Sequence, residues 1–506
     1  MENGGWLVTT SRVLLGGAAL YASGCGKGVP CVGEPSSTTV NDACGVFARA
    51  DAPAGGDGTQ AKPFARLADA VMAAESAGKR VYACTTGRFA EAVSVTAGIE
   101  VYGGLDCTNG WTWSEDARAQ LDGPADAIAL TVTSTAICAK VEGFAITGAP
   151  PSDMTTGGSS IAVVVDDVAA TLAHCDVRAS DAAAGVAGTA PSGPATKGAD
   201  APAPDPLTMA ACIAPVFVNG GAPGMTLCGD TDTSGGTGGM GGLPALNGFG
   251  ADGVDGVPAG KMDHGTGANA MNDCTEGGQG DAGAAGSPGQ GGSSMGDTVW
   301  LGGVRNTDET DGQSGTPGQG GGGGGGAEAG TFCPPNMTPT PGVGAGGGGG
   351  GAGGCGGQGG GGGRAGGSSI AIVSLGTRLT LTAVTLAVGK GGAGGTGAFG
   401  QGGALGGQGG DGGPAFPIAG SKKGCSGGQG GQGGGGGQGG GGRGGHAIGI
   451  AYATAPATVP VPMLQMFGPG MPGAGGMAGS GAPSSSNGAA GNAGPCWDFG
   501  RNAACE

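Results

Sequence analysis

The stretch Gly157-Gly-Ser-Ser-Ile-Ala162 recurs unchanged as Gly366-Gly-Ser-Ser-Ile-Ala371, 209 positions later, and Thr171-Leu172 recurs as Thr380-Leu381 at the same offset. Two further segments share the order of isoleucine, small residue and apolar residue: 128–130 and 448–450. Similar short strands stack as rungs that bury their apolar faces on one another. The repeats predict an all-β chain, one parallel β-helix interrupted by long glycine-rich segments. The alternative is chance similarity in a chain of low complexity.

The residues before these repeats predict a helix and then short strands. Apolar side chains at Phe64, Leu67, Val71 and Met72 follow Pro63 at helical spacing, which predicts one amphipathic helix that ends near Gly78. Short alternating strands are predicted next, separated by glycine and polar turns, at 81–84, 89–95 and 99–102.

This N-terminal region resembles the start of a right-handed parallel β-helix of the pectate-lyase-like superfamily, over roughly residues 48–180. The resemblance rests on Gly56-Asp-Gly-Thr59, on Pro63-Phe64, and on Tyr102-Gly-Gly104 followed by Trp111 and Trp113. It implies that the 64–77 helix caps the open end of the solenoid, where uncovered backbone would invite aggregation. It implies no particular chemistry.

Glycine accounts for 130 of the 506 residues, far above the usual share of about 7%. It occupies every third position from 277 to 292, from 391 to 412 and from 427 to 442. A period of three is that of a polyproline-II-type helix. These arrays therefore predict bundled polyglycine-II helices, with disorder as the alternative. Here the chain resembles the glycine-rich, PGRS-type bacterial surface proteins.

Composition excludes several classes of partner. Lys and Arg total 21 against 38 Asp and Glu, so the net charge is −17. This balance argues against nucleic acid, whose affinity comes from neutralised phosphates, and against electrostatic docking on anionic lipid. The partners that we expect are extracellular polysaccharide or other surface proteins.

The first residues indicate export. Arg12 precedes the apolar run Val13–Tyr21, which is too short to span a bilayer, and small residues then lead to Cys25. This ending resembles a bacterial lipobox and implies a lipid anchor on Cys25, although Ala22 stands where leucine is usual and Glu2 is acidic. We expect an exported protein in the cell envelope, lipid-anchored at the outer membrane or secreted, that contacts the membrane only through this anchor. The alternative is a short buried strand.

The chain has 15 cysteines and no C-x-x-C motif, so the spacing of zinc ribbons and redox motifs is missing. With Cys25 set aside, the even remainder in an exported chain predicts disulfides. Spacing alone cannot fix the connectivity, and sequential pairing is the simplest assignment. It gives Cys31–Cys44, Cys84–Cys107, Cys138–Cys175, Cys212–Cys228, Cys274–Cys333, Cys355–Cys425 and Cys496–Cys505.

Residues that could carry chemistry are few, and no catalytic set, cofactor or metal is predicted. Asp252 and Asp411 resemble calcium-binding nonapeptides but lack tandem copies, and the stretch from Asp230 lacks the final glutamate of an EF-hand. A polysaccharide-cleaving β-helix would use carboxylates and basic residues on one rung face. The candidates for that role are Asp166, Asp167, Asp176 and Arg178, with Asp166 and Asp167 more simply placed in a turn. The three histidines are scattered, at positions 174, 264 and 446.

The predicted organisation begins with a signal peptide with lipobox (1–25), a tether (26–47) and a β-helix module (48–181). It continues with a glycine-rich insertion (182–365), a rung (366–389), a glycine-rich array (390–445), a rung (446–462) and a Gly/Pro-rich tail with a cysteine pair (463–506). The expected function is that of a non-catalytic envelope protein in adhesion or a surface layer. The alternative is a carbohydrate-active β-helix enzyme or carbohydrate-binding module, which would need converging carboxylates and basic residues in one groove.

Overall fold

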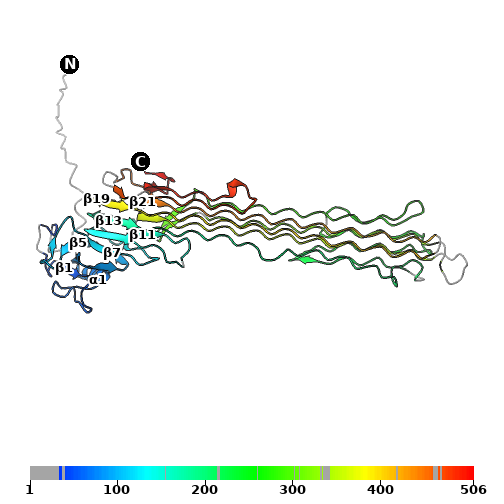
Figure 1. Ribbon diagram of the computed structural model, residues 1–506, viewed down its shortest axis with the longest axis horizontal. Helices are drawn as coiled ribbons and strands as arrows, with labels where there is room; N and C mark the ends of the chain where they lie inside the picture. The colour runs from blue at the N-terminus through cyan, green and yellow to red at the C-terminus, as the bar shows by residue number, and fades with distance from the viewer. Residues whose placement is uncertain are drawn as a thin grey trace, which may run out of the picture.

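A β-solenoid joined to a long straight bundle of glycine-rich segments forms the molecule (Figure 1). The computed structural model describes residues 33–36, 40–153, 155–213, 217–258, 260–300, 302–306, 308–330, 333, 342–417, 420–459, 465–467 and 470–505. The solenoid contains the only α-helix of this described part, and the bundle extends from one side of it.

Three sheets of stacked parallel strands make the solenoid. The first contains β1 (Gly45–Ala48), β2 (Arg80–Cys84), β5 (Glu100–Asp106), β9 (Ala139–Glu142), β12 (Ala170–Ala173) and β19 (Leu379–Thr382), with β6 (Thr112–Trp113) antiparallel to β5. The second contains β3 (Arg88–Ala90), β7 (Ala119–Asp122), β10 (Phe144–Gly148), β13 (Asp176–Ala179), β20 (Thr385–Ala387) and β22 (Gln465–Phe467). The third contains β4 (Val93–Val95), β8 (Leu130–Val132), β11 (Ser160–Val165), β18 (Ser369–Ser374), β21 (Ala447–Tyr452) and β23 (Ala493–Asp498), with β24 (Ala503–Ala504) antiparallel to β23.

The register confirms the repeats that predicted the fold. Ile161 lies opposite Ile370, which lies opposite Ile448 in the next rung. Thr171 and Leu172 pair with Thr380 and Leu381. Inward-facing side chains are buried in alternation along strands such as β10, so each rung adds a layer to one continuous apolar core. The chain therefore returns to the same stack after each glycine-rich excursion.

The predicted amphipathic helix is α1 (Leu67–Ala77), which packs against β1, β2 and β4. Leu67 and Val71 are buried as expected, but Met72 faces solvent with 61% of its surface exposed. No local side chain caps the helix; instead the buried carboxylate of Glu91 accepts the backbone N–H of Leu67 at 2.7 Å. Gly78 ends the helix in the left-handed conformation. The solenoid thus fixes where the helix starts.

All three long excursions leave the solenoid at the same corner. Each connects a strand of the second sheet with a strand of the third: 182–368 lies between β13 and β18, 389–446 between β20 and β21, and 470–492 between β22 and β23. Because the strands at this corner are stacked, the excursions emerge side by side and form one bundle (Figure 1). The region from 463 onward, expected to be a tail, thus adds a further rung and the third excursion.

Hydrogen bonds that advance three residues at a time connect the glycine segments. Gly442, Gly439, Gly436 and Gly433 donate in turn to carbonyls at 395, 398, 401 and 404, all at 2.8–2.9 Å. The bonds run between segments rather than within them, as the polyglycine-II arrangement requires. In the described residues, the arrays therefore satisfy their backbone polar groups by packing together, which favours the predicted bundle over disorder.

The segment 342–367 explains the runs of consecutive glycine. It is hydrogen-bonded to six other segments, namely 182–201, 218–226, 233–242, 310–330, 389–413 and 424–446. Where this segment is surrounded on every side, as at 346–351, no direction is left for a side chain. Added Cβ atoms at Gly350 and Gly359 would lie 1.9 Å and 1.8 Å from backbone carbonyl oxygens. Segments with fewer neighbours need glycine only in the positions that face a neighbour.

One row of positions along 424–446 shows this rule directly. Near the far end of the bundle the row carries Gln429 and Gln432, which are exposed. Nearer the solenoid, where 470–479 packs against it, the row becomes Gly441 and Gly444. Cβ atoms there would come within 2.0 Å of a carbonyl oxygen of that neighbour. Gly435 belongs to the same row, and a Cβ there would meet nothing closer than 3.8 Å, so the close contacts at Gly441 and Gly444, rather than glycine alone, mark where the neighbour begins.

Candidate functional site

The adjacent carboxylates Asp166 and Asp167 lie between β11 and β12, in the turn that the sequence favoured. Asp166 accepts the backbone N–H of Ser134 at 3.1 Å, and Asp167 forms an ion pair with Arg378 at 3.4 Å. Both contacts join successive rungs. These two carboxylates therefore stabilise the stack and do not form a pair in a groove.

The other rung candidates lie on or beside β13. Asp176 and Arg178 are exposed, and Asp176 contacts Arg118 at 3.6 Å and the Thr385 hydroxyl at 2.5 Å. His174 is not on a strand face: it has a positive φ of 47° at the corner before β13 and lies 3.3 Å from Glu115. Asp176 and His174 thus contact side chains of neighbouring rungs, an arrangement typical of structural ion pairs rather than of a groove with converging charges.

A cluster of converging ionisable groups does occur on the outer side of the first sheet. We call it the Lys140 cluster: Glu34, Arg80, Glu100, Tyr102, Lys140 and Glu142. The Lys140 ammonium lies 2.7 Å from Glu34 and 2.6 Å from Glu142, and 5.3 Å from the centre of the Tyr102 ring. Arg80 pairs with Glu100 at 2.5 Å and covers the same ring from 5.4 Å.

Burial and the shared ammonium act differently on the two carboxylates of Lys140. Burial raises the pKa of Glu142, because its hydrogen bond to Lys140 compensates only in part. At Glu34 burial also opposes ionisation, but the hydrogen bond and charge of Lys140 outweigh it, so the pKa of Glu34 is lowered. The segment 33–36 lies over the cluster, with the Gly33 carbonyl accepting from Arg80 at 2.7 Å. The cluster is thus paired internally and covered.

The glycine bundle contains the residues considered for calcium. Asp252 accepts the N–H of Gly267 at 2.7 Å, and Asp411 accepts from the Ser426 hydroxyl at 3.5 Å, both between neighbouring segments. His264 lies 2.6 Å from Asp255. No group of three or more His, Cys, Asp or Glu side chains suited to a metal ion occurs among the residues with described positions.

The third histidine belongs to a buried ionic cluster where the bundle meets the solenoid. We call it the junction cluster: Asp297, Arg443 and His446. Asp297 lies 2.8 Å from Arg443 and 3.1 Å from His446 Nε2, and the side chains of Arg443 and His446 are fully buried. Arg443 also donates to the carbonyl of Ser293.

Hydrogen bonds fix the protonation of His446. Its Nδ1 accepts the backbone N–H of Asn492 at 3.0 Å, so the ring proton of the neutral form lies on Nε2, facing Asp297. Burial lowers the pKa of His446 despite Asp297. Ser368 contacts the backbone N–H of His446 rather than its ring, so the geometry of a nucleophilic triad is not met. The cluster joins Asp297, which lies within the 182–368 excursion, to Arg443 and His446 at the end of 389–446. No sequence motif indicated Asp297 or Arg443.

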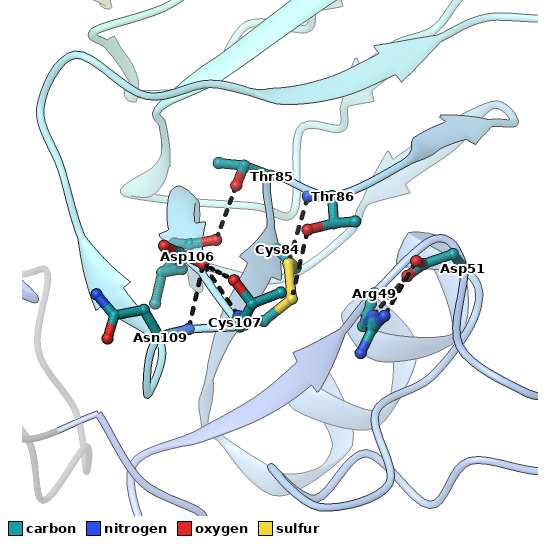
Figure 2. Close-up of a disulfide and its surroundings, with 10 residues drawn as sticks. Arg49, Asp51, Cys84, Thr85, Thr86, Asp106, Cys107 and Asn109 are labelled. Carbon is teal, nitrogen blue, oxygen red and sulfur yellow. Dashed lines mark hydrogen bonds and ion pairs between the residues drawn. A yellow bond between two sulfur atoms is a disulfide. The ribbon is translucent and has the colours of Figure 1, made fainter.

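Five disulfides are described, and two match the sequential assignment: Cys84–Cys107 and Cys496–Cys505. Figure 2 shows the first, which connects the end of β2 to the residue after β5, one rung further on. Beside it, Asp106 accepts the backbone N–H groups of Thr108 and Asn109 and so fixes the turn after β5 (Figure 2).

The remaining assignments need correction. The structure pairs Cys212–Cys333, Cys228–Cys355 and Cys274–Cys425 instead of Cys212–Cys228, Cys274–Cys333 and Cys355–Cys425. These bridges join segments that are neighbours in the bundle but 121 to 151 residues apart in sequence. Cys138–Cys175 is also wrong, because Cys138 is in a disulfide whereas Cys175 is a buried thiol. Cys44 is disulfide-bonded too; Cys31 and Cys25 lie outside the described residues.

Peptide mapping under non-reducing conditions checks this connectivity. We expect linked peptides for the three long-range bundle disulfides and alkylation of Cys175 only after unfolding, because that thiol is buried and its pKa is raised to about 12 by burial. A peptide joining Cys212 to Cys228 would contradict the packing of the bundle. Cys84–Cys107 serves as the internal control.

The five bridges indicate an oxidising compartment, in agreement with export. Within the described residues, no helix has the length and apolar character needed to cross a membrane. The chain matches no protein-family profile, no curated protein and no solved structure.

Proposed function

We propose that this chain is a non-catalytic cell-envelope protein that acts in adhesion or as part of a surface layer. In this proposal the solenoid is the end attached to the cell. The bundle extends from the solenoid and presents the surface of the bundle at a distance from the cell. The carrying observation is the cross-linked bundle itself. Backbone hydrogen bonds and the disulfides Cys212–Cys333 and Cys228–Cys355 join segments within the 182–368 excursion, and Cys274–Cys425 joins that excursion to 389–446.

Position in the chain supports this orientation. The earliest described residues lie against the solenoid, where Glu34 pairs with Lys140 and Gly33 with Arg80. A lipid anchor on Cys25 would therefore attach the solenoid end. A segment such as 389–413 reaches about 75 Å if it rises by ~3.1 Å per residue, as a polyproline-II-type helix does. The same proposal includes three further points. The solenoid is right-handed and pectate-lyase-like, α1 caps its open end, and the chain is related to PGRS-type proteins.

A carbohydrate-active enzyme or carbohydrate-binding module is the second candidate. The observation that favours it is the Lys140 cluster, which brings carboxylates, basic groups and an aromatic ring together on one sheet. Its groups are already paired with one another and covered by 33–36, so the first proposal is better supported. Release of soluble sugars from envelope polysaccharide by the purified chain would favour the second.

Replacing the proposed anchor tests location and function together. We expect Cys25→Ser to move the protein from the membrane fraction to the soluble fraction and to abolish any cell adhesion that the wild type confers. The cysteine count does not support the anchor, because Cys175 is already the odd thiol of the fifteen, and Cys44 and Cys138 are both disulfide-bonded outside the five described bridges. The membrane-fraction assay decides the point. Cys175→Ser is the matched control. Adhesion that is unchanged in cells lacking the protein would overturn the proposed function.

A further inference from the structure

The bundle loses two of its segments partway along its length. Near the end far from the solenoid, 218–226 and 233–242 both pack against the central segment 342–367. A hairpin of β14 (Leu227–Cys228) and β15 (Thr231–Asp232) joins these two segments and ends them. Between this hairpin and the solenoid, the backbone of the central segment bonds to four described segments instead of six. In the described part of the chain, two positions beside it are therefore left without a neighbour.

A cavity of about 430 Å³ lies where the two segments stop. This volume is within the range of small-ligand sites, roughly 300–1,000 Å³. The Cys228–Cys355 disulfide forms part of the wall and joins the hairpin to the central segment. Segments 182–201 and 310–330 form two further parts of the wall. The cavity is therefore held in shape by a disulfide and by backbone packing.

One wall of the cavity contains a bulge. Gly361 of the central segment donates to Thr189 in this wall, and Cys355 donates to Thr196. Between these two bonds the central segment advances by six residues, whereas the wall segment advances by seven. Gly193 lies in the bulge in the left-handed conformation, with a φ of 74°. The extra residue widens the cavity and interrupts the regular period of three.

Backbone groups that face the missing segments are left without partners. Every third N–H of the central segment from Gly347 to Gly353 donates to a carbonyl of 233–242. The next N–H of this row belongs to Gly356, which lines the cavity, and no described residue accepts from it. The carbonyl of Gly315, in the opposite wall, likewise receives no hydrogen bond from the described part of the chain. The cavity thus offers both a donor and an acceptor of the main chain.

The side chains that line the cavity are all uncharged. Four of them carry hydroxyl or amide groups that make no hydrogen bond to another described residue: Ser192, Thr196, Ser314 and Gln358. Pro194 and Pro317 add small apolar surfaces. In a chain with a net charge of −17, this lining combines many hydrogen-bonding groups with no charge.

We propose that this cavity binds a neutral saccharide. A sugar hydroxyl both donates and accepts, so it matches a lining that presents an N–H, a carbonyl, hydroxyls and an amide. The C–H faces of a sugar ring pack on surfaces such as those of Pro194 and Pro317. An ionic ligand would find no opposite charge in the cavity, and an apolar ligand would leave the polar groups unpaired.

A longer saccharide has room to continue from the cavity toward the solenoid. The N–H of Gly359, one triplet beyond Gly356, also has no acceptor among the described residues. At the next triplet the row is closed, because Gly362 donates to the carboxylate of Asp311 at 2.7 Å. This inference deepens the proposed adhesive function, and rests on it for its biological role, because it assigns the bundle a ligand class, polysaccharide of uncharged sugars.

Native electrophoresis of the purified full chain through gels that contain dextran, mannan or β-1,3-glucan tests the proposal. We expect at least one of these neutral polysaccharides to retard the wild type, and the anionic polygalacturonate not to do so. Ser314→Trp should abolish the retardation because the indole fills the cavity, and Gln358→Ala should weaken binding ~5-fold because it removes one hydrogen-bonding group. Both side chains are exposed, so neither substitution disturbs the core. Gln313→Trp is the matched control, because Gln313 is exposed beside Ser314 but does not line the cavity.

Amide hydrogen exchange gives a second readout, since the polysaccharide that retards the chain should slow exchange at Gly356. Three results would overturn the proposal: no retardation by any of the three neutral polysaccharides, retardation by polygalacturonate alone, or retardation that is unchanged in Ser314→Trp. Retention of binding in Gln313→Trp and unchanged circular dichroism show that the loss in Ser314→Trp is not a loss of fold. Cell adhesion without saccharide binding would overturn this inference alone. Saccharide binding by a chain that confers no adhesion would support the site and contradict only the proposed function.

Discussion

Gly403→Ala is expected to destabilise the bundle by about 2–4 kcal/mol, whereas the neighbouring Gly402→Ala is expected to be neutral or slightly stabilising. A Cβ at position 403 would lie 1.9 Å from the carbonyl oxygen of Gly433, in the segment that packs against it. The two segments would have to separate, which strains the packing and weakens the bond from Gly433 to Ala404. Overpacking costs about 1–3 kcal/mol and a lost buried hydrogen bond about as much.

Gly402 is a matched control, because it lies one residue away in the same segment. Nothing lies within 4 Å of its added Cβ, and alanine there lowers the entropy of the unfolded chain, worth up to about 1 kcal/mol. Amide hydrogen exchange across 389–446 measures local opening directly, whatever the solenoid does. Equal protection in the two variants would show that these segments are not packed at backbone distance.

The sequence predicted the solenoid because its rungs carry distinctive side chains. Ile161, Ile370 and Ile448 could be aligned by eye and do stack on one another. Nearly the same offset continues into the bundle: Gly188 bonds to Thr396, 208 positions later, because both segments start from adjacent rungs. The repeat in the rungs therefore also predicts which segments of this part of the bundle lie side by side.

The order of the remaining neighbouring segments could not be predicted, because glycine has no side chain that distinguishes one segment from another. The period of three indicates that a segment packs against others but not which ones. This is why the sequential disulfide assignment failed in the bundle: Cys228 faces Cys355 across neighbouring segments, although Cys212 is much closer in sequence. In the solenoid, where Cys84 and Cys107 lie one rung apart, the same assignment succeeded.

The junction cluster escaped detection for a related reason. Asp297 and Arg443 come from different excursions, and neither belongs to a motif. Near the cluster, backbone bonds such as that from Ala447 to Asn492 fix the order of the excursions as they enter the third sheet. Ionic side chains provide the pairing specificity that glycine lacks, because a charged group is stabilised only opposite a group of opposite charge. The buried charges therefore specify which excursions meet at the base of the bundle.

Asp297→Ala is expected to cost about 3–5 kcal/mol, because it leaves the buried Arg443 without its counter-charge. Asp308→Ala is the matched control: its pair with Arg305 is 3.6 Å long and about 70% exposed on both sides, so the loss should be below about 1 kcal/mol. Chemical unfolding of both variants gives the comparison. A second variant, Asp297→Ala with Arg443→Met, should recover part of the loss, because it removes the orphaned charge. Equal stability of the two single variants would contradict a buried ion pair at the junction.

Acid should weaken the same cluster through His446. Its pKa is lowered in the folded chain, so the unfolded chain binds the proton more readily. The stability from the neutral ring is therefore fully present above the unfolded value of about 6.5 and falls as the pH drops below it. Protonation of Nδ1 would also break its bond from Asn492. The unfolding free energy of the wild type should thus fall more steeply between pH 7 and pH 5 than that of His446→Gln, and parallel curves would show that the buried imidazole does not carry this acid sensitivity.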